Sequence, residues 1–180
     1  GNDNTPVYSP DGNYLAWRSM ERAGFEADKE RLFLQDRQSG KIRDLTEKFD
    51  RSVGSLVWTP DSTGIFFTAE DQGESPIYST GPDATVPIKL VGAHNDDLVF
   101  SADGKTLFFT RVSTAAPNEI FSNSLPIPAP EAEGTRASRQ ITRMNDALLS
   151  QIEMQPLEPF TFKGANNEDA FERRFARLGG

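Results

Sequence analysis

One phrase occurs three times along this chain: a tight turn built on aspartate, followed at once by a short apolar segment. The copies begin at Ser9, Thr59 and Ser101, so they lie 50 and 42 residues apart. In the first copy a proline presets one bend of the turn, Asp11 can bond its own backbone, and Gly12 accepts a positive φ. A unit that recurs at this interval beside an apolar strand is typical of β-propeller blades.

The repeats predict an all-β fold, a partial β-propeller of three four-stranded blades. The blades are expected over about residues 5–46, 54–91 and 97–143. The expected strands cover 6–9, 14–18, 31–36 and 42–46 in the first blade, 55–58, 65–69, 77–80 and 88–91 in the second, and 98–101, 107–112, 119–123 and 139–142 in the third. Residues 1–145 form the propeller part in this interpretation, and 146–180 form a separate extension.

The second strand of a blade carries apolar rings at consecutive positions, as in Phe66–Phe67 and Phe108–Phe109. A sheet with one wet face alternates apolar and polar residues instead. We therefore expect neighbouring blades to cover both faces. By the same reasoning, the aromatic residues at corresponding blade positions are expected in the core and not in a ligand-binding box: Trp17, Trp58, Phe67 and Phe109.

Three blades do not close a ring, so the first and last sheets each have an outer face without a neighbour. If about 400 Å² of apolar area stays wet on such a face, the loss is roughly 10 kcal/mol at about 25 cal/mol per Å². That is comparable to the stability of a whole domain. We expect these faces to be covered by the rest of a longer chain, by a second copy, or by neighbouring molecules.

The composition argues against several partners and sites. The formal net charge of −8 disfavours nucleic acid and anionic membranes as partners. The sequence has no cysteine, which excludes disulfides and thiolate metal sites. A run of about 18 apolar residues, as a membrane span requires, does not occur, and no cofactor is expected.

The segment after the third repeat has a different pattern. Residues 126–134 are rich in Pro, Ala and Glu and are expected to form a solvated loop. Residues 146–155 fit either a short helix or an extended crossover, and 160–163 fit a strand. Residues 167–178 are expected to be helical, with Phe171, Phe175 and Leu178 on one face.

Three segments carry a resemblance to a known family: Leu15–Lys29, Phe49–Gly54 and Glu70–Gly73. Together with the repeated turn, they resemble the propeller of prolyl-oligopeptidase-family serine peptidases, in the dipeptidyl-peptidase-5-like and acylaminoacyl-peptidase-like branch. The resemblance covers residues 5–169, and the tail from Ala170 departs from it. TolB-like propellers share the turn, so the turn alone does not separate the two groups.

The resemblance implies that an α/β-hydrolase domain follows the propeller, with residues 149–169 as the crossover and first hydrolase strand. The nucleophile of such a hydrolase sits in a Gly-x-Ser-x-Gly elbow, which this sequence lacks. The chain is therefore expected to be non-catalytic on its own. In the parent enzyme the propeller would restrict access and help to seat the N-terminus of a peptide substrate. The implied partners are that hydrolase domain or a second copy of the chain.

The loop over residues 19–30 contains the candidate binding residues. In the resembled family, loops at this position face the hydrolase domain, and acidic propeller residues can hold the free α-amine of a substrate. Glu26 and Glu21 are the candidate carboxylates, and Arg22 is a candidate carbonyl-binding or inter-domain residue. The alternative is a solvated charged loop. For Glu70, Asp71 and Glu74, in the corresponding loop of the next blade, we expect the solvated alternative.

The only histidine, His94, precedes Asn95-Asp96-Asp97. We expect it in a solvated loop, with neither a catalytic role nor a metal site built with Asp96 and Asp97. A rival to the peptidase interpretation is a free-standing TolB-like module that binds a protein or glycan. A hydrolase crossover at residues 149–169 favours the first interpretation, and a fourth blade there favours the second. The compartment is open, with a periplasmic or secreted location favoured over the cytoplasm.

Overall fold

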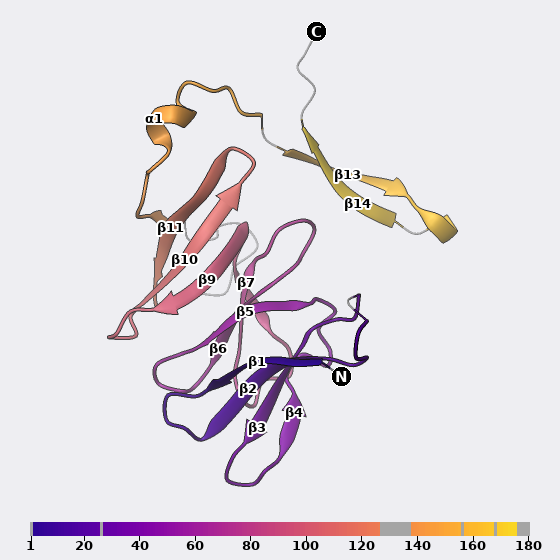
Figure 1. Ribbon diagram of the computed structural model, residues 1–180, viewed down its shortest axis with the longest axis vertical. Coiled ribbons are helices and arrows are strands. Elements are labelled where there is room, and N and C mark those ends of the chain that lie inside the picture. The colour runs from indigo at the N-terminus through magenta and orange to yellow at the C-terminus, as the bar shows by residue number, and fades with distance from the viewer. Residues whose placement is uncertain (1, 26, 127–137, 156, 168, 176–180) are drawn as a thin grey trace.

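The computed structural model describes residues 2–25, 27–126, 138–155, 157–167 and 169–175. Twelve strands in these ranges form three separate four-stranded sheets, each a meander of antiparallel strands in chain order. The sheets follow one another along the molecule as blades 1, 2 and 3 (Figure 1). This is the open, partial propeller that the repeated turn predicts.

The strand bounds agree closely with those expected from the sequence. Blade 1 consists of β1 (Asn2–Tyr8), β2 (Tyr14–Met20), β3 (Arg31–Asp36) and β4 (Ile42–Asp44). Blade 2 consists of β5 (Val53–Trp58), β6 (Ile65–Ala69), β7 (Ile77–Thr80) and β8 (Ile88–Val91). Blade 3 consists of β9 (His94–Phe100), β10 (Thr106–Ser113), β11 (Ala116–Ser124) and β12 (Arg139–Gln140). The first strands extend further than predicted, and β9 includes His94, which was expected in a loop.

The first strands of successive blades, β1, β5 and β9, contact one another and form the inner edge of the array. Each pairs with its second strand through an irregular register, between Asn4 and Val7 in blade 1, between Val53 and Leu56 in blade 2, and opposite Phe108 and Thr110 in blade 3. A bulge at this point bends the strand and increases its twist. A register irregularity of this kind therefore recurs at the corresponding place in all three blades.

Two apolar cores fill the spaces between blades. The first, between blades 1 and 2, includes Ala16, Leu34 and Phe67, and the second, between blades 2 and 3, includes Phe66 and Phe109. Phe66 and Phe67 therefore lie in different cores, although they are adjacent in the chain. This confirms the expectation of two covered faces for Phe66–Phe67, but not for Phe108–Phe109, because Phe108 belongs to neither core.

Of the four aromatic residues expected in the core, three are buried: Trp58, Phe67 and Phe109. Trp17 is only half-buried, and its indole stacks on Phe33 with ring centroids 5.8 Å apart. Trp17 corresponds to Phe67 and Phe109 in the repeat, but no sheet among the described residues packs on its side of blade 1. For Trp17 the core prediction is therefore wrong.

The repeated turn is built in the same way in all three blades. The hydroxyl of Ser9, Thr59 or Ser101 donates to the aspartate two residues later, at 2.5, 2.6 and 2.6 Å. These hydrogen bonds are the first cause of the lowered pKa of Asp11, Asp61 and Asp103. Such a local side-chain bond stabilises the turn without any contact between blades.

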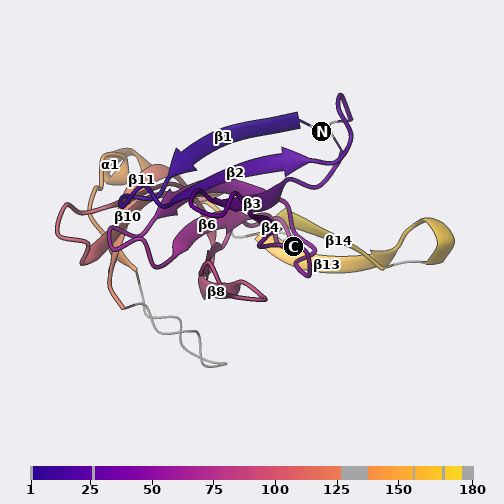
Figure 2. The ribbon, with the colours of Figure 1, turned by 90° about the horizontal axis from the view of Figure 1, so that it is seen from below.

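After blade 3 the chain forms a one-turn helix, α1 (Asp146–Leu149), and then a separate hairpin. The hairpin pairs β13 (Leu157–Lys163) with β14 (Asp169–Phe175) across the short 3-10 turn η1 (Ala165–Asn167). Figure 2 shows this hairpin extending away from the blades. Neither described helix has the length or apolar character needed to cross a bilayer.

The helix expected over 167–178 is wrong for residues 169–175, which form β14. Asn166 and Asn167 adopt φ values of 57° and 60°, a left-handed conformation that asparagine tolerates and that reverses the chain. The reversal brings residues 169–175 alongside β13, and strand pairing overrides their helical spacing. Residues 176–178 and most of the predicted 126–134 loop lie outside the described residues.

Candidate functional site

The loops that join second to third strands lie at one end of the blades, together with the connections from each blade to the next. We call this the loop end and define it by residues 19–30, 45–52, 70–76, 92–94 and 113–116. The Ser-Pro-Asp-Gly turns lie at the opposite end, because strand direction alternates within each sheet. The loop end is held together by backbone contacts between blades, including Val53 N to Glu30 O at 2.9 Å.

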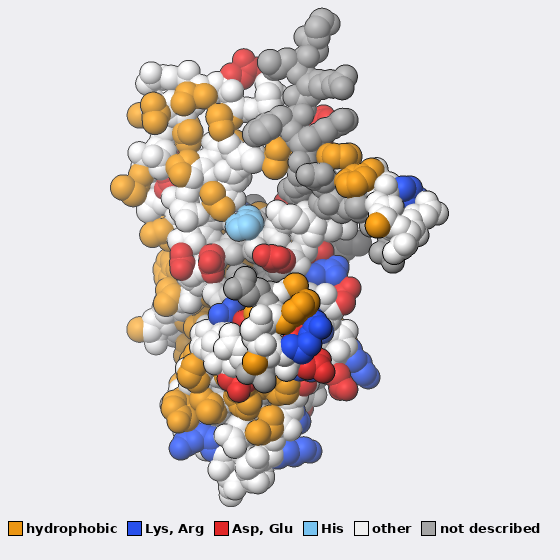
Figure 3. Space-filling view, turned by 45° about the vertical axis from the view of Figure 1, so that its right-hand side comes forward, with side chains coloured by type: hydrophobic (Ala, Val, Ile, Leu, Met, Phe, Trp, Pro, Cys, Tyr) orange, Lys and Arg blue, Asp and Glu red, His pale blue; other side chains and the backbone are white. Residues whose placement is uncertain are grey.

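A polar hollow of about 470 Å³ opens at the loop end, beside the inner strands. Its lining comes from all three blades and includes six ionisable side chains: Arg18, Asp28, Glu30, Glu70, His94 and Asp96. Figure 3 shows the histidine at the surface with acidic side chains close to it. Four carboxylates against one arginine give this lining an excess of negative charge, which suits a cationic group.

Arg18 and Glu30 lie in this hollow and are only partly paired. Arg18 donates to Val53 O at 3.2 Å and to Thr5 Oγ1 at 3.0 Å, and Glu30 Oε1 accepts from Asn4 Nδ2 at 2.9 Å. The remaining atoms, Arg18 Nε and Glu30 Oε2, are buried without a hydrogen-bond partner among the described residues. Buried polar atoms are usually paired, so these two are suited to bind water or a polar ligand.

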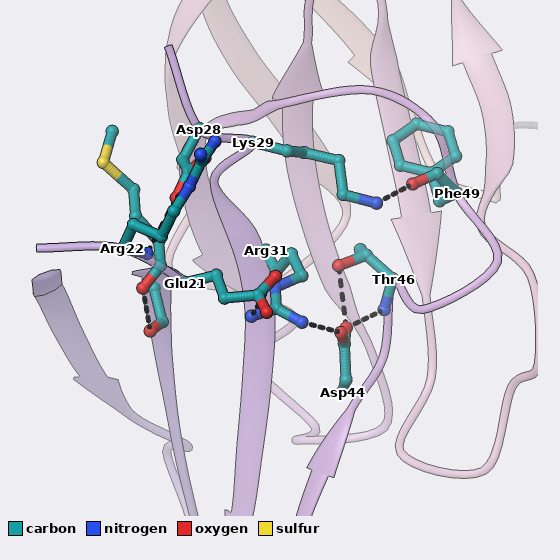
Figure 4. Close-up of polar contacts among 10 residues, drawn as sticks. Glu21, Arg22, Asp28, Lys29, Arg31, Asp44, Thr46 and Phe49 are labelled. Atoms are coloured by element: carbon teal, nitrogen blue, oxygen red, sulfur yellow. Dashed lines mark hydrogen bonds and ion pairs between the residues drawn. The ribbon is translucent and has the colours of Figure 1, made fainter. Parts of the chain in front are cut away.

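Arg22 is tied to its own loop (Figure 4). Its guanidinium binds both carboxylate oxygens of Asp28, and its backbone N–H donates to Asp28 Oδ2 at 2.7 Å. The guanidinium also lies over the Phe25 ring, 3.8 Å from the centroid. The hydrogen bonds from Arg22 hold the pKa of Asp28 below its usual range. Arg22 therefore stabilises the conformation of the loop and neutralises the charge of the Asp28 carboxylate.

Glu21 points away from the hollow toward solvent. Its side chain is 79% exposed, and its nearest cation is Arg31, with Nη2 at 4.0 Å from Oε2. Arg31 in turn faces Asp44 at 3.7 Å (Figure 4). Glu21 thus lines a smaller depression of about 270 Å³ that also includes Asp28. Glu26, the other candidate carboxylate, lies outside the described residues.

His94, Asp96 and Asp97 do not converge. His94 and Asp96 are exposed, and Asp97 Oδ2 accepts from Thr110 Oγ1 at 3.0 Å. No group of three His, Asp or Glu side chains arranged to hold a metal occurs within the described ranges. Asn95, between them, is buried and anchors the loop end, since it donates to Gly92 O and Ala93 O at 2.8 Å and accepts from Arg111 at 2.9 Å.

The expectation of a solvated loop is wrong for Asp71. Its carboxylate binds Arg51 and Lys89, both at 3.1 Å, and accepts from Tyr78 Oη at 3.3 Å. Glu74 also has a partner, because its Oε2 accepts from Ala93 N at 3.1 Å. Glu70 is exposed, as expected. The two cationic partners, Arg51 and Lys89, lie 20 and 18 residues away from Asp71, so no local pattern in the sequence indicates these ion pairs.

Comparison with known proteins agrees with this architecture. Residues 4–121 match the family described as prolyl oligopeptidase, N-terminal β-propeller domain. Dipeptidyl-peptidase 5 of Porphyromonas gingivalis is 30% identical over 152 residues, which is 84% of this chain and 21% of that protein. The chain thus spans about a fifth of the length of the curated relative it matches.

Solved structures show the same fold. Acylaminoacyl peptidase from Pyrococcus horikoshii aligns with a TM-score of 0.68 and 14% identity, over 93% of this chain and 24% of that one. A putative TolB from Agrobacterium tumefaciens aligns with a TM-score of 0.59 and 22% identity, over 78% of this chain and 47% of that one. These identities are low, so the likeness concerns the fold alone.

Blades in an open array, with a polar hollow at one end, define a propeller domain and not a hydrolase fold. The chain belongs to the prolyl oligopeptidase N-terminal β-propeller domain family. In that family the propeller is distinct from the catalytic domain.

Proposed function

We propose that this chain is the non-catalytic propeller portion of a serine exopeptidase of the dipeptidyl or acylaminoacyl peptidase type. Its loop end faces the hydrolase domain of the complete enzyme, limits access to peptides, and helps to seat the substrate N-terminus. The observation that supports this most directly is the excess of carboxylates around the hollow at the loop end. An ammonium group in a partly dry cleft needs such anionic acceptors.

Within this proposal, Glu21 and Glu26 remain the candidate amine anchors. Glu21 is suited to contact a partner outside the propeller, because its carboxylate is largely exposed and only loosely paired. Arg22 acts through the loop conformation, since Asp28 already engages its guanidinium. A role of Arg22 as a carbonyl-binding residue requires that this ion pair open when substrate or the hydrolase domain arrives.

The hairpin of β13 and β14 favours the peptidase interpretation over a free-standing TolB-like module. Residues 149–169 were the point at which the two interpretations differ. In the described part of the chain, β13 pairs with β14 and with no strand of a blade, so this segment does not extend the array as a fourth four-stranded blade. A strand pair that stands apart from the blades fits a segment that leads out of the propeller.

Two measurements test the proposal. The chain alone should release no product from chromogenic dipeptide substrates, and a measurable turnover that copurifies with it contradicts the non-catalytic role. In a form that continues into the hydrolase domain, Glu26→Gln and Glu21→Gln should raise KM for free-amine peptides. Peptides with an acylated N-terminus serve as the control. If KM for the acylated peptides rises equally, the amine-anchor role is wrong.

A further inference from the structure

A second hollow, of about 460 Å³, lies at the loop end beside the polar hollow. It opens between the loops of blades 2 and 3 and the first residue of β13, and its aliphatic lining consists of Ala93, Val112, Ala115 and Leu157. We call it the aliphatic hollow. The volumes of both hollows are within the range of about 300–1,000 Å³ that is usual for ligand pockets.

The two hollows differ in what their polar atoms require. At the edge of the aliphatic hollow, Glu74 Oε2 accepts from Ala93 N at 3.1 Å, and Ser113 Oγ accepts from Ala115 N at 3.2 Å. Of the buried side-chain atoms that lack a partner among the described residues, none belongs to a residue that lines this hollow. The polar hollow contains two such atoms, on Arg18 and Glu30. A polar ligand group is therefore needed in the polar hollow and not in the aliphatic one.

His94 lines both hollows and is the boundary between them. It faces Val112 across the pairing of β9 with β10. Ala93, just before it, lines the aliphatic hollow, whereas Asn95 and Asp96, just after it, line the polar hollow. Its side chain is exposed (Figure 3), so it forms a shared rim and not a buried wall. A ligand that sits over His94 therefore reaches both hollows at once.

The polar hollow holds one carboxylate in a fixed orientation. Glu30 Oε1 accepts from Asn4 Nδ2 at 2.9 Å, and Asn4 Oδ1 accepts in turn from Thr5 Oγ1 at 3.0 Å. Thr5 has a φ of 51°, a strained conformation for a β-branched residue, and its hydroxyl also accepts from Arg18 Nη2 at 3.0 Å. These contacts fix Glu30 and leave its Oε2 as a buried acceptor without a partner among the described residues.

We propose that the two hollows together bind the first residue of a peptide, with its ammonium group at Glu30 in the polar hollow and its side chain in the aliphatic hollow. The carboxylates suit the ammonium group, and the carbon-rich lining suits an aliphatic side chain. In an α-amino acid both groups stem from the same carbon atom, so the sites that receive them must adjoin, as these do at His94. The inference rests on the proposed function and adds its substrate class: peptides with a free amine and an aliphatic first residue.

Proton NMR of the full 180-residue chain without a histidine tag tests this, because His94 is the only histidine and its ring protons report on both hollows. Leucinamide carries both groups, glycinamide the amine alone, N-acetyl-leucinamide the side chain alone, and lysinamide a cationic side chain. At one fixed pH, leucinamide should bind about tenfold more tightly than each of the other three. Equal binding of glycinamide leaves the seating of the amine intact and overturns the aliphatic subsite. Equal binding of N-acetyl-leucinamide contradicts the ammonium site, tighter binding of lysinamide contradicts the aliphatic preference, and no shift with any ligand overturns the inference.

Variants assign each ligand group to its hollow. Val112→Ala removes aliphatic lining, and Ala115→Leu fills the hollow from an exposed loop position, so each should weaken leucinamide about fivefold and leave glycinamide unchanged. Glu30→Gln keeps an oxygen for Asn4 but loses the charge, so it should weaken both amines about tenfold and leave N-acetyl-leucinamide unchanged. Val86→Ala is the matched control, because Val86 is 50% exposed and lines neither hollow. Hollow variants that weaken both amines equally, or a Glu30→Gln variant that binds both amines normally, contradict the assignment.

Discussion

The backbone N–H of Asp11, in the turn of blade 1, donates to Ser62 Oγ in the turn of blade 2 at 3.1 Å. Ser62 occupies the turn position that glycine holds in the other two repeats, and it adopts a φ of 62° where Gly12 has 73° and Gly104 69°. The serine side chain is buried. Blade 2 therefore accepts a strained backbone at this position and gains a hydrogen bond between blades.

Two substitutions at Ser62 should separate these opposing effects. Ser62→Ala keeps the left-handed strain and removes the acceptor of a part-buried hydrogen bond between blades, so it should destabilise the fold by about 0.5–1.5 kcal/mol. Ser62→Gly also loses the acceptor but relieves strain worth about 1–2 kcal/mol, so its net effect should stay within about 1 kcal/mol. Urea unfolding at one fixed protein concentration measures both. Equal losses for the two variants contradict this account.

Gly54, in the inner strand of blade 2, is required for close packing. A Cβ at this position would lie 2.4 Å from Thr68 Oγ1, a hydroxyl that already accepts from Ser55 N at 3.0 Å. Gly54→Ala should therefore cost about 1–3 kcal/mol through overpacking. The matched control is Gly92→Ala, because a Cβ there meets nothing within 4 Å. A Gly54→Ala variant as stable as the Gly92→Ala variant shows that the inner strand moves to accommodate the methyl group.

The sequence predicts the strands of the repeated blades well. It does not predict elements that depend on contacts outside the repeat. The strands β3, β6, β7 and β8 have their predicted bounds because each is fixed by a local turn and a short apolar run. The hairpin strand β14 could not be predicted, since its identity depends on pairing with β13 and its apolar spacing also fits a helix.

The candidate site was predicted less completely than the fold. The loop over residues 19–30 does lie at the loop end, but no sequence pattern indicates that Asp28 binds Arg22 or that Arg18 and Glu30 line one hollow. The Arg22–Asp28 pair depends on the folding of one loop, whereas the contact of Arg18 with Val53 O joins two blades. Neither contact follows from the pattern of a single repeat.

Glu119 should make stability depend on pH. Its carboxylate accepts from Thr142 Oγ1, Met144 N and Asn145 N, which joins β11 to the chain just before α1. These hydrogen bonds, with that from Thr142 the largest, lower its pKa below the ordinary value of 4.5. Because the folded-state pKa is depressed, the stabilisation is complete above the unfolded pKa and is lost as pH falls through the folded pKa.

Glu119→Gln should therefore lower the melting temperature at neutral pH and have progressively less effect as the pH falls below about 4.5. Thermal melts of both proteins between pH 7 and 3 give the difference in melting temperature at each pH. Taking this difference removes the contribution of the other carboxylates, which both proteins share. A difference that stays constant over this range shows that the charge of Glu119 does not contribute.

The hydroxyl of Tyr78 reports on the Asp71 network. Burial, followed by the negative charge of Asp71, raises the pKa of Tyr78 to about 12. Asp71→Asn removes the charge and leaves the burial, so the pKa of Tyr78 should fall but remain above its ordinary value of 10.0. A spectrophotometric titration of the phenolate measures it, with Tyr8→Phe and Tyr14→Phe in the background so that Tyr78 is the only tyrosine left. Because the neutral phenol is favoured in the folded state, its stabilising effect is lost above pH 10 as the unfolded chain ionises. If Asp71→Asn leaves the titration of Tyr78 unchanged, burial alone sets its pKa.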